Sequence, residues 1–144
     1  MKKVILSLFC ALNLSANDIN THVPSKELQQ LLSTEMSYIK SGMDEILYGI
    51  ISGDYAKISQ VAAKIQHSYI LQDSITPAQK AEMKQTFSPK FMEYDMEFHE
   101  SAQDLANFAE FEDKKSVLQT YSNMVNQCIR CHETFATFRF KKEK

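Results

Sequence analysis

The stretch "VLQTYSNMVNQCIRCHETF" (residues 117–135) predicts a long amphipathic helix that carries two of the chain's three cysteines. Its apolar side chains recur at alternating steps of four and three residues, which is the spacing of one face of an α-helix. The series is Val117, Tyr121, Met124, Cys128, Cys131, Phe135 and, beyond the quoted stretch, Phe138. Both cysteines are therefore expected on the inward face of a helix that runs from about residue 113 to residue 140.

The rest of the chain predicts three more helices and almost no strand. They are expected over residues 24–52, 54–71 and 76–111, the last of them broken near the pair Ser88–Pro89. Gly53 is expected to end the first helix, and Asp54 and Thr76 to cap the next two. Amphipathic helices joined by short connections pack side by side. The predicted fold class is all-α, an antiparallel four-helix bundle; an assembly of separate coiled-coil chains is the alternative.

The first 16 residues have the three-part pattern of a secretory signal peptide. Lys2 and Lys3 form a positive segment, "VILSLFCALNL" is a short apolar segment, and Ala16 offers a cleavage site. Cys10 would leave with this signal, and a buried N-terminal helix is the alternative interpretation. We therefore expect export to the periplasm and a mature domain of residues 17–144.

The charge and hydropathy of the remaining chain exclude two classes of partner. The full chain has a formal charge of −2, and loss of Lys2 and Lys3 leaves 14 basic and 18 acidic residues, or −4. A mildly acidic protein is a poor nucleic-acid binder. No other apolar run approaches the length of a membrane span. The mature chain is expected to bind neither nucleic acid nor the membrane interior.

Two cysteines three residues apart serve three kinds of chemistry: dithiol exchange, zinc binding and covalent haem attachment. Exchange-active thiols lie partly exposed at a helix start, whereas this pair is predicted in mid-helix and facing inward. Zinc needs further ligands, and the other histidines, His22, His67 and His99, are scattered. C-x-x-C-H is the attachment signature of c-type haem. The motif predicts one haem c, with Cys128 and Cys131 as its thioether residues and His132 on the iron.

The position of this motif on the last helix of an exported helical bundle resembles the class II cytochromes c. That family includes the cytochrome c-prime proteins and their low-spin relatives. "CIRCHETF" (128–135) matches the family's motif followed by an aromatic residue, here Phe135. "EMSYIKSGMDEILYGIISGD" (35–54) resembles the family's opening helix, with two methionines seven residues apart and a glycine-acid ending. The resemblance covers the whole mature chain in architecture but few specific residues.

The resemblance implies that His132 is the proximal ligand and that Met36 lies over the distal face of the haem. Met36 also belongs to a regular apolar series, so core packing is its alternative role. That series is Leu32, Met36, Ile39, Met43, Ile46 and Ile50. Met43, Met92 and Met96 are weaker candidates for the distal ligand. The family often has basic residues where this chain has Leu32 and Ala136. Lys40, Arg130 and Arg139 are the alternative candidates for the haem propionates, and the sequence does not choose among them.

The function that this resemblance implies is single-electron transfer through a His/Met-ligated haem. Such a protein is an electron carrier, not an enzyme; its partners are redox proteins, and a homodimer is possible by analogy. A five-coordinate haem that binds nitric oxide or another diatomic gas is the alternative function, and a dithiol redox protein is a third. His67 and His99 have polar neighbours in the sequence and are expected on solvated helix faces.

Overall fold

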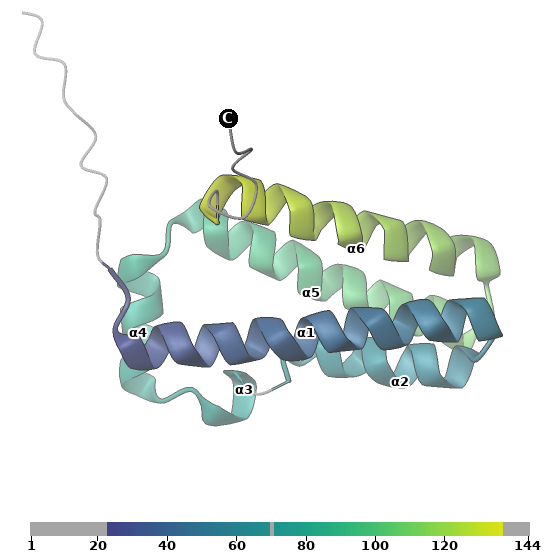
Figure 1. Cartoon of the computed structure of the whole chain (residues 1–144), viewed down its shortest axis with the longest axis horizontal. Helices are drawn as coiled ribbons and strands as arrows, with labels where there is room; N and C mark the ends of the chain where they lie inside the picture. The colour runs from purple at the N-terminus through teal and green to yellow at the C-terminus, as the bar shows by residue number, and fades with distance from the viewer. Residues whose placement is uncertain (1–22, 70, 137–144) are drawn as a thin grey trace, which may run out of the picture.

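A computed structural model describes residues 23–69 and 71–136, and every regular element within them is an α-helix (Figure 1). The helices are α1 (Lys26–Ser52), α2 (Tyr55–Gln66), α3 (Leu71–Ser74), α4 (Pro77–Thr86), α5 (Pro89–Glu110) and α6 (Lys114–Phe135). The predicted all-α class is confirmed. Three parts of the sequence analysis lie outside the described residues. They are the predicted signal peptide, which includes Ala16; His22; and residues 137–144, which include Phe138 and Arg139.

The four long helices α1, α2, α5 and α6 lie lengthwise beside one another, and each runs opposite to the one before it (Figure 1). α2 packs against α1 and α5, and α5 packs against α6. α1 and α6, by contrast, make few direct contacts. The connected core consists of Ile39, Met43, Ile46, Ile58, Val61, Ala62, Ile65, Phe98, Ala102, Leu105, Ala106, Ala109, Val117 and Met124. None of the described helices has an apolar stretch long enough to cross a membrane.

The helix starts follow the predicted local chemistry. The side chain of Asp54 accepts a hydrogen bond from the backbone N–H of Lys57, and Thr76 forms a capping box with Gln79. These contacts satisfy backbone N–H groups that have no partner inside the helix. Gly53 ends α1 in the left-handed conformation, with φ of 72°. The predicted caps and the break before Pro89 are confirmed.

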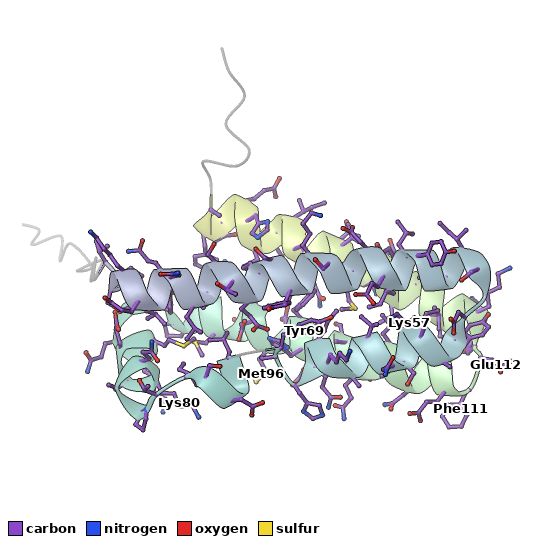
Figure 2. The ribbon with its side chains drawn as sticks, turned by 60° about the horizontal axis from the view of Figure 1, so that its bottom comes forward. Lys57, Tyr69, Lys80, Met96, Phe111 and Glu112 are labelled. Atoms are coloured by element: carbon purple, nitrogen blue, oxygen red, sulfur yellow. The ribbon has the colours of Figure 1, made fainter. Side chains whose placement is uncertain are left out.

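The predicted end of the second helix at residue 71 is wrong. α2 ends at Gln66, and Ser68 turns the chain with a positive φ of 56°. The short helix α3 then begins at Leu71 in a new direction. Tyr69, in the connection, lies against α1 (Figure 2). The chain turns early because α1 supplies contacts for this connection, as described below.

Candidate functional site

A cavity of about 440 Å³ opens between α1, α5 and α6, where α1 and α6 diverge. Its volume lies within the range of small-molecule and cofactor sites. The lining residues are Ser33, Met36, Ser37, Ile39, Lys40, Met43 and Asp44 from α1, Tyr94, Asp95 and Phe98 from α5, and Tyr121, Val125, Gln127, Cys128, Cys131 and His132 from α6. All four candidate site residues of the sequence, namely Met36, Cys128, Cys131 and His132, therefore line one cavity.

The opposite directions of α1 and α6 bring these residues together. Met36 lies in the first half of α1, and the C-x-x-C-H motif lies in the last turns of α6. Because the two helices are antiparallel, the beginning of α1 is level with the end of α6 (Figure 1). α5 forms the third wall with Tyr94 and Phe98. The site thus depends on the tertiary fold and on residues far apart in the sequence.

Cys128 and Cys131 are half-buried free thiols on the cavity side of α6. Burial raises the pKa of Cys128, and the charge on Cys131 adds to this effect. Burial also raises the pKa of Cys131, with Asp95 adding and Arg130 opposing. The raised pKa values favour the protonated thiols at neutral pH, whereas exchange-competent thiolates have lowered pKa values.

His132 is half-buried and follows Cys131 on the same helix. The end of this helix is held to α5 by aromatic contacts. Phe135 lies edge-on to Phe91 and Tyr94, with ring centroids 5.3 and 5.9 Å apart, and Phe87 stacks on Phe91. Phe135 was expected to be buried, but it is 39% exposed. Its contacts nevertheless fix the helix end just beyond His132.

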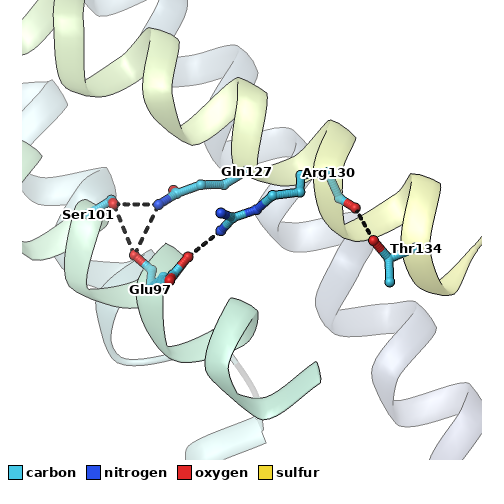
Figure 3. Close-up of polar contacts among 5 residues, drawn as sticks. All are labelled: Glu97, Ser101, Gln127, Arg130 and Thr134. Carbon is cyan, nitrogen blue, oxygen red and sulfur yellow. Dashed lines mark hydrogen bonds and ion pairs between the residues drawn. The ribbon is translucent and has the colours of Figure 1, made fainter. Parts of the chain in front are cut away.

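Polar contacts hold the motif segment of α6 to α5 (Figure 3). The side-chain nitrogen of Gln127 donates to the Ser101 hydroxyl at 2.9 Å. The Arg130 guanidinium pairs with the Glu97 carboxylate and lies over the Tyr94 ring, 4.0 Å from its centroid. Gln127 directly precedes Cys128 and Arg130 directly precedes Cys131, so these contacts fix the rotation of α6 that turns both thiols toward the cavity.

Met36 lies at the cavity rim and is 38% exposed. The alternative in which Met36 packs in the core is therefore wrong. Met43, one of the weaker candidates, is buried and also lines the cavity, whereas Met92 and Met96 do not line it. Met124 is fully buried in the core. Two methionines of α1 thus have access to the same space as His132.

The two histidines outside the motif differ in their surroundings. His67 is exposed at the end of α2, as predicted. The prediction that His99 lies on a solvated face is wrong, because its side chain is only 16% exposed. Its ring contacts the backbone of α2 and the carboxylate of Asp95. Neither His67 nor His99 lines the cavity.

The cavity has few cations. Its charged lining residues are Lys40, Asp44 and Asp95, and Lys40 is already paired with Asp44 at 2.9 Å. Arg130 is engaged with Glu97 outside the lining, and Arg139 lies outside the described residues. Of the three cations proposed for the haem propionates, only Lys40 is therefore seen at the cavity.

Sequence reasoning missed Glu35, the residue before Met36. Glu35 is the one charged residue among the described ones that is fully buried. It accepts hydrogen bonds from the backbone N–H groups of Tyr69 and Leu71, at 2.7 and 3.2 Å. Its spacing of four residues from Ile39 and seven from Gly42 was the available signal, because both of those positions face inward. Glu35 fixes α1 beside Met36.

Comparisons of the chain with models of protein families, with curated proteins and with solved structures find no match. Within the described residues, no three His, Cys, Asp or Glu side chains are grouped so that they could hold a metal ion. The donor set at the cavity fits a haem: two thiols three residues apart, an adjacent imidazole, and a thioether from the facing helix. The apolar walls at Ile39 and Phe98 suit a porphyrin.

Proposed function

We propose that this chain is an exported c-type cytochrome that carries single electrons through one covalently attached haem. Cys128 and Cys131 form the thioethers, His132 is the proximal ligand of the iron, and Met36 is the distal ligand. The observation that carries this proposal is that these four side chains, which come from the first and last long helices, line the same cavity.

The haem, when bound, supplies a one-electron couple that changes little in structure between its two states. His132 is presented by the helix that carries both thioether residues, so the motif fixes the imidazole relative to the attachment points. Met36 and Met43 offer thioether sulfur from α1, and methionine–histidine ligation raises the reduction potential of a haem. The buried side chains Ile39 and Phe98 exclude water from the inner wall.

The arrangement of the four long helices supports this proposal. Antiparallel neighbours, with short connections from α1 to α2 and from α5 to α6, are what a four-helix bundle requires, and in such bundles cofactor sites lie between facing helices. This architecture and the motif on the last long helix agree with the resemblance to the class II cytochromes c. The signal-like N-terminus supports export to the periplasm, where covalent attachment of haem takes place.

Exposed apolar side chains beside the cavity support docking of a redox protein. Met36 and Val125 lie on the rim, with exposed fractions of 38% and 37%. Leu47 extends the stripe of Met36 and Met43 along α1, and Ile129 extends that of Val125 along α6, with exposed fractions of 43% and 41%. A redox protein that docks beside the cavity would contact Met36 and Val125 first. A homodimer is proposed only from the resemblance.

The exposure of Met36 favours a second candidate function. A thioether that core packing does not hold in place leaves the distal side of the iron accessible. The protein would then bind nitric oxide or another diatomic gas at a five-coordinate haem, as the cytochrome c-prime proteins do. The two candidates share Cys128, Cys131 and His132 and differ only at the distal ligand.

An absorption spectrum of the exported, purified protein tests the proposal, in both oxidation states and with and without carbon monoxide. We expect a low-spin spectrum with the far-red methionine–iron band and no change on addition of the gas. Met36→Ala should lose this band and bind carbon monoxide, whereas the matched control Met96→Ala, in an exposed position outside the cavity, should not. A high-spin spectrum that shifts with carbon monoxide would support the gas-binding candidate, and absence of haem would refute both.

A further inference from the structure

His99 is a mostly buried imidazole between two helices. Its Nδ1 atom lies 2.6 Å from the carbonyl oxygen of Ile65, in the last turn of α2. Its Nε2 atom lies 3.7 Å from Oδ1 of Asp95, one turn earlier on α5. Glu35 of α1 contributes a further negative charge nearby. His99 is thus surrounded by acceptors and negative charge on three helices.

This geometry favours the protonated ring. A carbonyl oxygen can only accept a hydrogen bond, so Nδ1 must carry a hydrogen. In the neutral ring, Nε2 would then present its lone pair to the Asp95 carboxylate, whereas protonation converts this contact into an ion pair. Burial lowers the pKa of His99, but Asp95, the Ile65 carbonyl and Glu35 together outweigh burial and raise the pKa above its ordinary value. Protonation of His99 is therefore favoured in this site relative to a free histidine side chain.

Asp95 connects this proton to the cavity. The residue that pairs with His99 also lines the cavity together with Cys131 and His132. Burial is the largest cause of the raised pKa of Cys131 on α6, and the negative charge of Asp95 is the second largest. The Asp95–His99 pair carries a charge of −1 when His99 is neutral and no net charge when it is protonated. The cavity wall thus changes its charge with the state of His99.

We propose that Asp95 and His99 form a proton-binding pair that tunes the haem of the proposed function and couples its reduction to the uptake of one proton. The inference rests on that function. A negative wall stabilises the more positive, oxidised haem, and a neutral wall favours the reduced one; solvent shields Asp95, whose side chain is 36% exposed, more than the mostly buried His99. Linkage is reciprocal, so reduction strengthens proton binding at His99.

The coupled step moves one electron and one proton. One electron arrives from a one-electron donor protein, and one proton arrives from bulk water and ends on Nε2 of His99. Asp95 keeps its carboxylate throughout and forms no covalent bond. On oxidation the electron leaves to an acceptor protein and the proton returns to water. In this step His99 binds the proton and Asp95 positions its ring; neither residue is placed on the iron.

The test is a redox titration of the full exported chain at a series of pH values between about 5 and 9, across the range in which histidine titrates. The potential of the wild type should fall as the pH rises, with a slope of up to about 59 mV per unit, the value of a tenfold change for a one-electron couple. His99→Gln keeps a donor for the Ile65 carbonyl but cannot titrate, so its slope should vanish. Asp95→Asn should raise the potential and move the sloped region to lower pH. The exposed His67→Gln is the control and should retain the wild-type slope.

A second readout follows the imidazole itself by NMR. The pKa of His99 should be higher in the reduced than in the oxidised protein, with proton affinity changed about threefold or more. Equal pKa values in both states, or an unchanged slope in His99→Gln, would overturn the coupling. If the chain carries no haem, the proposed function fails separately. The proton pair is then judged on the haem-free chain, where a His99 pKa at or below the ordinary value would overturn it.

Discussion

The Glu35 carboxylate oxygen Oε1 lies 2.7 Å from the backbone nitrogen of Tyr69, and this contact joins α1 to the connection between α2 and α3. The other carboxylate oxygen accepts from the N–H of Leu71 at 3.2 Å. Leu71 is the first residue of α3, where backbone donors have no partner within the helix, and Tyr69 lies two residues earlier in the connection. One buried side chain thus joins α1, one residue before Met36, to the connection after α2 and to the first residue of α3.

Replacement of Glu35 should destabilise the fold strongly. Glu35→Ala leaves two N–H groups without this acceptor, and we expect the free energy of unfolding to fall by about 3 kcal/mol. Glu35→Gln keeps one acceptor oxygen and should lose less. Glu27→Ala, at an exposed acid in the first turn of the same helix, should change stability by only about 0.5 kcal/mol or less. Denaturant unfolding measures all three, and equal losses in Glu35→Ala and Glu27→Ala would contradict the anchoring role.

Gly42 is required by the position of the Tyr69 ring. A Cβ atom at residue 42 would lie 2.2 Å from the Tyr69 hydroxyl oxygen, and the ring itself stacks on Tyr38 with centroids 5.6 Å apart. Gly42→Ala should therefore lower the free energy of unfolding by about 1–3 kcal/mol through overpacking, despite the better helix propensity of alanine.

The matched experiment makes Gly42→Ala in a variant that lacks the Tyr69 ring. In a Tyr69→Ala background, Gly42→Ala should cost much less, because the remaining close neighbour is the end of the Ile65 side chain, 3.3 Å from the added Cβ, and the better helix propensity of alanine acts against that contact. A thermodynamic double-mutant cycle gives the coupling between the two positions. The same loss in both backgrounds would show that Tyr69 does not impose the glycine.

Protonation of His99 should make stability depend on pH. Its folded-state pKa is raised, so its contribution is fully present below the unfolded pKa of about 6.5 and is lost as the pH rises through the folded value. The free energy of unfolding should accordingly fall over this window in the wild type and in His67→Gln, but not in His99→Gln. Urea unfolding at successive pH values measures this free energy. If it falls with pH in His99→Gln as much as in the wild type, another titrating group causes the dependence.

Local chemistry in the sequence was sufficient to predict most helix boundaries. Asp54 and Thr76 act through backbone groups three residues away, and Gly53 acts through its own φ angle. After the end of α2, by contrast, Ser68 has a positive φ angle and the next residues contact Glu35, which is distant in the sequence. Periodicity therefore extended α2 too far, since it contains no information about a buried carboxylate on another helix.

The side of a helix that faces a cavity is also not visible in its periodicity. Met36 and Ile39 belong to one apolar series, but Ile39 faces the core while Met36 lies on the open side, where α1 leaves α6. The prediction that His99 lies on a solvated helix face is wrong for a related reason. Its polar neighbours in sequence lie elsewhere on the helix, whereas its contacts are Asp95, four residues earlier, and the backbone of α2.

The most direct test of the central proposal is acid extraction of haem from the exported protein after denaturation. If Cys128 and Cys131 hold the haem by thioethers, the haem colour stays with the wild-type polypeptide and is lost from the Cys128→Ala, Cys131→Ala double variant. Haem that remains attached to the double variant, or a wild-type chain that carries no haem, would contradict the account.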